Sequence, residues 1–204
     1  MLRRLLQLYI GLVLYGVSTA LFVHANLGAD PWDVFHLGAA KQLGISFGTV
    51  IILTGAAVLL LWIPIRQMPG LGTVSNVIVL GLAADATLAV LPPLESLVAR
   101  SVLLVGAIVL NAIATGMYIG AGFGPGPRDG LMTGLHARTG WSLRGIRTAI
   151  ELTVLVIGWL LGGKFGVGTV IYALSIGPLI QLCLPWFRQP VSRKAVSTPQ
   201  EIVS

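Results

Sequence analysis

The chain has 204 residues and a mean hydropathy of +0.90, with 55% apolar and only 10% charged residues. A soluble domain carries about 25% charged residues, so this composition excludes a soluble domain and indicates a polytopic membrane protein built from α-helices. The net charge of +6 would suit a nucleic-acid-binding protein, but its placement along the chain indicates membrane topology instead, and we expect no nucleic acid partner.

Six apolar stretches are long enough to cross a lipid bilayer as helices, because about 20 helical residues span the hydrocarbon layer. The first stretch is too long for the h-region of a signal peptide and lacks a small-residue cleavage site, so we expect it to be retained. In chain order the predicted spans are 5–23, 48–65, 74–91, 101–119, 147–161 and 169–186.

Two shorter helices are predicted over residues 32–43 and 128–139, each after a Gly-rich break that ends in a proline. A proline in the first turn favours the start of a helix, and Asp30 is a natural N-cap for the first one. Both segments are too short and too polar to face lipid. We therefore expect broken or re-entrant helices here, and not a seventh and an eighth span.

The chain repeats itself at a distance of 96 residues. Between positions 28 and 81, 13 of 54 residues are identical to the residue 96 positions later, and the identities concentrate in residues that set backbone geometry, such as Pro31 with Pro127. Three spans per copy would place the second copy upside down, which is the inverted repeat of many transporters. The sequence thus predicts a first repeat over 1–94, a second over 95–188, and a disordered cytoplasmic tail over 189–204.

The basic residues support one orientation of the six spans. If the N-terminus is cytoplasmic, ten lysines and arginines lie inside, and only Lys41, Arg100 and Lys164 lie outside. This distribution follows the positive-inside rule and puts both termini in the cytoplasm. An eight-span arrangement would give the same ten-to-three split of basic residues, so charge placement alone does not separate the six-span and eight-span arrangements.

Asp33 and Asp129 occupy equivalent places in the two repeats, each two residues after the proline that starts a short helix. In a functional interpretation, the two helix N-termini point into the membrane from opposite sides and present N–H groups and a carboxylate to a solute. Arg128 and its counterpart Trp32 would then complete a solute-binding site, with Arg128 suited to an anionic group. The alternative is structural: both aspartates cap their helices, and Arg128 pairs with Asp129 as a topological charge.

Further polar residues lie inside the predicted spans. Asp85 is the deepest ionisable group, and Glu151 lies four residues after Arg147 on the same helix face. Charge in a bilayer is costly unless it is paired or hydrated, so Asp85 and Glu151 are candidates for proton coupling, or else paired structural groups. Asn76, Asn111 and Arg147 are expected to support the site.

No motif in the sequence indicates catalysis or a bound metal. His24, His36 and His136 lack the spacing of metal ligands, and Cys183 is the only cysteine. Nucleophile–base pairs, Walker loops and zinc motifs are absent from the sequence. We expect no enzyme, no cofactor and no metal site.

These motifs together resemble the YczE-like group of bacterial integral membrane proteins, distantly related to the YitT family. The resemblance covers nearly the whole chain except the tail, and it implies a multi-pass protein of the bacterial cytoplasmic (inner) membrane. It implies no activity and no catalytic residues. The segments that carry it are 27–36, 69–73, 126–132, 138–140, Arg147 with Glu151, 162–163, 166–169 and 177–178.

The sequence favours a small secondary transporter or permease for a small polar or anionic solute, coupled to protons through Asp85 or Glu151, with one repeat rocking against the other. The alternative is a membrane accessory protein that transports nothing and stabilises a partner complex. A membrane-embedded enzyme acting on lipids lacks any catalytic pair. Besides the lipid bilayer and the solute, a second copy of the chain in a homodimer is a candidate partner.

Overall fold

The computed structural model describes residues 1–188, and within them the fold is entirely helical. The predicted tail over 189–204 lies outside the described residues. The helices are α1 (Leu2–Ala25), α2 (Pro31–Leu43), α3 (Phe47–Ile65), α4 (Leu71–Val90), α5 (Leu97–Gly120), α6 (Pro127–Thr139), α7 (Leu143–Leu160) and α8 (Val167–Phe187).

Within the described residues, five helices are long and apolar enough to cross a membrane: α1, α3, α4, α5 and α8. The prediction of an all-helical polytopic membrane protein is therefore confirmed. The remaining predicted span falls on α7, which carries Arg144, Arg147 and Glu151 within its 18 residues. The sixth span and the inverted arrangement of the repeats stay predictions.

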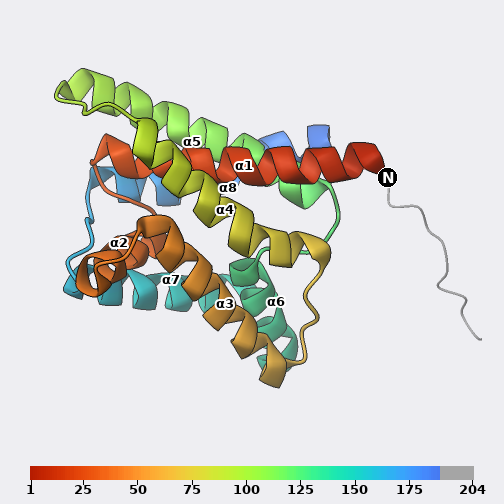
Figure 1. Cartoon of the computed structure of the whole chain (residues 1–204). Coiled ribbons are helices and arrows are strands. Elements are labelled where there is room, and N and C mark those ends of the chain that lie inside the picture. Colours follow the sequence, from red (N-terminus) through yellow and green to blue (C-terminus); the bar gives the residue numbers. More distant parts are fainter. Residues whose placement is uncertain (189–204) are drawn as a thin grey trace, which may run out of the picture.

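The helices form two layers (Figure 1). In the first layer α1 packs against both α4 and α5, and α5 packs against α8. In the second layer α2 packs against α7, and α3 packs against α6. The layers are joined where α3 packs against α4. The short helices thus lie in the second layer, beside the long helices of the first.

Local sequence signals explain where the short helices begin and end. Pro31 and Pro127 occupy the first turn of α2 and α6, and both helices end at a glycine, Gly44 or Gly140, with positive φ. As predicted, the Asp30 side chain caps α2 by accepting a hydrogen bond from the Asp33 N–H at 2.8 Å. The bounds of α6 equal those of α2 shifted by 96 residues.

The Gly-rich break before each short helix binds the first turn of a long helix from the other half of the chain. The Gly168 N–H of α8 donates to the Leu27 carbonyl at 2.8 Å, and the Gly72 N–H of α4 donates to the Phe123 carbonyl at 2.9 Å. These bonds satisfy amides that a helix start leaves without a partner inside the helix. Each half of the chain therefore helps to place the other.

The contact between α2 and α7 depends on small residues. A methyl group on Gly158 of α7 would overlap the backbone of Phe35, and one on Gly38 of α2 would overlap the Gly158 carbonyl. Only glycine lets the two backbones approach this closely, as is common where helices meet in membranes. This contact fixes α2, and with it one end of the cavity described below.

Replacing Gly158 with valine should therefore destabilise the fold by about 1–3 kcal/mol, because the added side chain would force α2 and α7 apart. The matched control is Gly106→Val on α5, where an added Cβ would meet no atom within 4 Å among the described residues. Thermal unfolding of the detergent-solubilised variants measures both. Equal melting temperatures would contradict the packing described here.

Candidate solute-binding cavity

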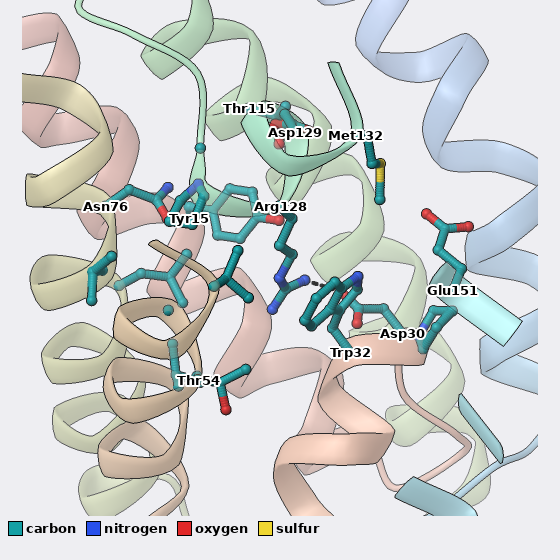
Figure 2. A pocket seen from close by; sticks show the side chains of 18 of the residues that line it. Tyr15, Asp30, Trp32, Thr54, Asn76, Thr115, Arg128, Asp129, Met132 and Glu151 are labelled. Carbon is teal, nitrogen blue, oxygen red and sulfur yellow. Dashed lines mark ion pairs between the residues drawn. The ribbon is translucent and has the colours of Figure 1, made fainter. Parts of the chain in front are cut away.

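A cavity of about 240 Å³ lies where α2 and α6 begin, and all eight helices contribute to its walls (Figure 2). Asp30 and Trp32 come from the start of α2, and Arg128 and Asp129 come from the start of α6. The N-termini of the two short helices therefore converge on one space. The positive ends of two helix dipoles and several charged side chains meet there.

Arg128 joins the two short helices electrostatically. Its guanidinium lies 3.6 Å from an Asp30 carboxylate oxygen and 3.9 Å from one of Asp33, and 4.8 Å above the centre of the Trp32 ring. Both aspartates are buried, while the Arg128 side chain is 24% exposed. The two ion pairs are longer than hydrogen bonds, so the guanidinium keeps N–H groups that can donate to a solute.

Asp33 lies beside the cavity and not in its wall. Its carboxylate is hydrogen-bonded to Nδ1 of His36 at 3.1 Å, and both side chains are almost fully buried. His36 itself contributes to the wall. The predicted role of Asp33 in direct solute contact remains a prediction, whereas its contact with Arg128 makes it part of the support of the site.

Within residues 1–188, Asp129 is the cavity carboxylate that has no basic partner. It is exposed and accepts one hydrogen bond, from the Tyr118 hydroxyl at 3.0 Å. No basic side chain lies within 4 Å of it in the part of the chain that the structure describes. A carboxylate can accept about four hydrogen bonds, so Asp129 retains acceptor capacity on the cavity side.

Arg147 and Glu151 form the pair that their spacing predicts. Nε of Arg147 donates to a Glu151 carboxylate oxygen at 2.8 Å, and both residues line the cavity from α7. Asn76 lines it from α4. Asn111 lies outside the wall, where it donates to Ser18 at 2.9 Å and accepts from the Tyr172 hydroxyl at 3.1 Å, which holds that tyrosine in the wall.

Asp85 lies away from the cavity, at the contact between α3 and α4. Its carboxylate accepts from the Ser46 hydroxyl at 2.5 Å and from the Gly48 N–H at 2.6 Å, so it binds the first turn of α3. Six of the nine predicted site residues therefore line the cavity, and three do not. Those in the wall are Trp32, Asn76, Arg128, Asp129, Arg147 and Glu151.

Two residues of the cavity wall, Trp32 and Thr115, each carry a buried polar atom, Nε1 or Oγ1, that has no hydrogen-bond partner within residues 1–188. Each residue is only 6% exposed. Buried polar groups in folded proteins are nearly always hydrogen-bonded, so a pair of such atoms on one cavity is a reason to expect a polar ligand.

Sequence reasoning missed the wall residues on α1, α5 and α8. Tyr15, Thr115, Tyr118 and Tyr172 lie singly in apolar stretches, and nothing in their spacing separates them from ordinary core residues. One signal was present: Tyr172 lies 96 residues after Asn76, so the two halves place polar groups at equivalent positions.

Comparison with known proteins gives the family of the chain. The model of a family of unknown function, DUF6198, matches residues 2–185. An uncharacterized protein of Haemophilus influenzae is 37% identical over 177 residues, covering 87% of this chain and 81% of the relative. The uncharacterized membrane protein YczE of Bacillus subtilis is 31% identical over 179 residues, covering 87% and 83%. The predicted YczE-like membership is confirmed, and no solved structure matches.

Arg128→Gln should destabilise the protein by about 3 kcal/mol, because it leaves two buried aspartates without their positive partner. Arg147→Gln breaks a pair whose arginine is 52% exposed, so its cost should stay below about 1 kcal/mol. Thermal unfolding of both variants in the same detergent compares them. A smaller loss for Arg128→Gln than for Arg147→Gln would contradict the role of Arg128 as the link between α2 and α6.

Proposed function

The chain belongs to the family of unknown function DUF6198, and we propose that it is a small secondary transporter that moves a small polar solute across the cytoplasmic membrane. The observation that carries the proposal is the convergence of two short-helix N-termini on one polar cavity. Discontinuous helices whose N-termini meet at a solute site between two repeats are typical of secondary transporters.

Equivalent positions of the two halves line the cavity, which supports a site between two repeats. Eight pairs of counterparts 96 residues apart contribute to the wall, and most of these pairs differ in chemistry, so equivalent positions of the two halves give the cavity an asymmetric lining. These pairs are Asp30 with Gly126, Pro31 with Pro127, Trp32 with Arg128, His36 with Met132, Ile51 with Arg147, Gly55 with Glu151, Asn76 with Tyr172, and Leu80 with Ile176.

The contact of α3 with α4 closes one side of the cavity. A Cβ on either Gly48 or Gly81 would overlap the other residue's carbonyl oxygen, so the two backbones touch. Asp85 of α4 secures this contact through its two hydrogen bonds to the first turn of α3. In a transporter, such a contact would act as a gate with Asp85 as its latch.

The equivalent contact between α7 and α8 is absent from the described residues. The counterparts of Gly48, Gly81 and Asp85 are Arg144, Gly177 and Gln181. Arg144 and Gln181 are exposed, and a Cβ on Gly177 would meet nothing within 4 Å. Both helices line the cavity, yet they do not pack together as α3 and α4 do.

This asymmetry supports alternating access as the mechanism. In the second state, the second layer would rock so that α7 closes on α8 while α3 leaves α4. With six spans and a cytoplasmic N-terminus, α3 begins on the outer side of the membrane, and the present state opens inward. Neutralising Asp85 would weaken the latch, which is how a proton could couple to the cycle, and Glu151 is a second coupling candidate within the cavity.

One observation favours the alternative of a membrane accessory protein that transports nothing. Arg128 and Arg147 both pair with carboxylates, as they would in a purely structural network. Access of water separates the two functions, because a transport site must be reachable by polar solutes from one side of the membrane.

Thr54→Cys, in a Cys183→Ser background, places a thiol in the cavity wall, and we expect a permeant, positively charged methanethiosulfonate reagent to modify it in intact membranes. The matched control is Val109→Cys, on the outer face of α5, which lipid should shield. Mass spectrometry of the extracted protein measures the modified fraction. If the cysteine at position 54 is as unreactive as the one at position 109, the cavity is dry and the transporter proposal fails.

The second state can be trapped by paired cysteines. Arg144→Cys with Gln181→Cys should form a disulfide in membranes under mild oxidation, because their counterparts Gly48 and Asp85 are in contact across α3 and α4. Adding Asp85→Asn should raise the rate of cross-linking, because the latch that holds the opposite gate is weaker. The control pair is Arg144→Cys with Leu174→Cys. The Leu174 side chain lies on α8 and is 75% exposed. No cross-link above this control would argue against rocking.

A further inference from the structure

We propose that the solute is a small organic ammonium ion that also carries a hydrogen-bond-accepting oxygen, the chemistry shared by amino acids and amino alcohols. This inference rests on the proposed transport function and narrows the solute from any small polar or anionic molecule. It follows from the charge balance of the cavity, from the carboxylate with spare capacity, and from the donors that have no partner.

The charge balance disfavours a simple anion. Three carboxylates line the cavity, those of Asp30, Asp129 and Glu151, against two guanidinium groups, those of Arg128 and Arg147. Asp33 adds a fourth carboxylate next to Arg128. The two helix N-termini add about half a positive charge each, so the carboxylates still exceed the positive charges, and this excess favours a ligand that brings a positive charge.

Asp129 is the place for the ammonium group. The other carboxylates have cationic partners: Asp30 and Asp33 share Arg128, and Glu151 is bound by Arg147. Asp129 has only the Tyr118 hydroxyl, within the described residues. An ammonium group donates three hydrogen bonds, and the unused acceptor sites of Asp129 can take them.

The unpartnered donors call for an oxygen on the same ligand. Nε1 of Trp32 is a donor only, so an ammonium group cannot satisfy it, whereas a carboxylate or hydroxyl oxygen can. Thr115 can either donate or accept. Trp32 and Arg128 lie together on one part of the wall (Figure 2). A ligand that carries both an ammonium group and an oxygen could donate to Asp129 and accept from Nε1 of Trp32.

The start of α6 adds further donors. In α2 the Asp30 side chain caps the first turn, but its counterpart in α6 is Gly126, which has no side chain to accept from the first-turn amides. Gly126 lines the cavity together with Pro127 and Arg128. An oxygen of the solute can therefore occupy the capping position that Asp30 fills in the other half.

The test measures thermal stability of the purified full-length protein with matched probes. Two series are used, one built on alanine and one on leucine. Each contains the amino acid, the corresponding amino alcohol, the carboxylate that lacks the amine, and the alkylamine that lacks the oxygen. A ligand that binds only the folded state raises the melting temperature, and at a given concentration a tighter ligand raises it more. We expect stabilisation by the amino acid, the amino alcohol or both, and none by the other two probes.

Variants then assign the contacts. Asp129→Asn should weaken binding of the stabilising probe by at least about tenfold, and Asp129→Glu should restore part of it. Trp32→Phe should weaken binding of that probe while leaving the fold intact, because the ring is retained and only the unpartnered N–H is lost. Glu95→Gln, an exposed carboxylate between α4 and α5, is the charge-matched control and should bind as the parent does.

The outcomes distinguish this inference from the proposed function. Stabilisation by the carboxylate or the alkylamine alone, or by no probe, overturns the inference. In that case, reactivity of the cysteine at position 54 with the polar thiol reagent would leave the transporter proposal standing. An unreactive cysteine at that position would overturn both the transporter proposal and the inference about the solute. An amino acid and an amino alcohol that bind equally would identify the ammonium and one oxygen as the recognised groups, as proposed.

Discussion

The cavity is organised around the ion pairs that link the start of α6 to the start of α2, those of Arg128 with Asp30 and Asp33. Both helices direct a positive dipole end at the same space, and Arg128 adds a full positive charge. Such an arrangement would be repulsive in a bilayer without anions. Asp30, Asp33 and Asp129 supply them, and the first two hold Arg128 from the opposite helix. Charge compensation at the meeting point is therefore what allows two helix N-termini to face one another inside the protein.

The same constraint explains why neither half of the chain forms a complete unit. In the break before α2, the Leu27 carbonyl accepts a hydrogen bond from the first turn of α8. In the break before α6, the Phe123 carbonyl accepts one from the first turn of α4. Backbone groups in a membrane must be satisfied inside the protein, and here they are satisfied across the two halves. Positive φ at Gly28 and Gly124 lets both breaks turn towards the short helices. The cavity lies where these exchanged contacts bring the halves together.

The helices could be predicted from local sequence signals. The site could be predicted only in part, because it depends on tertiary packing. Proline and glycine marked the ends of α2 and α6 to within one residue, and i,i+4 spacing predicted the Arg147–Glu151 pair. These features depend on near neighbours in sequence. Which face of a long helix meets the cavity depends on how the two layers pack, so Tyr15 and Tyr118 could not be told from core residues. For the same reason Asp85, the deepest acid in the sequence, proved to bind a helix start and not to line the cavity.

Residues that are identical in the two halves set the backbone, whereas residues that differ set the chemistry of the cavity and of the helix contacts. Residues that are the same in both, such as Pro31 with Pro127, set the backbone and would give two equivalent states. The differences break that equivalence: Gly48 and Asp85 close α3 on α4, whereas Arg144 and Gln181 leave α7 apart from α8. A two-state element responds to a ligand only through contacts that differ between its states. Because the lining pairs also differ, as Trp32 does from Arg128, a solute bound there would touch unlike walls, and in the proposed transport cycle its contacts would change as one gate opens and the other closes.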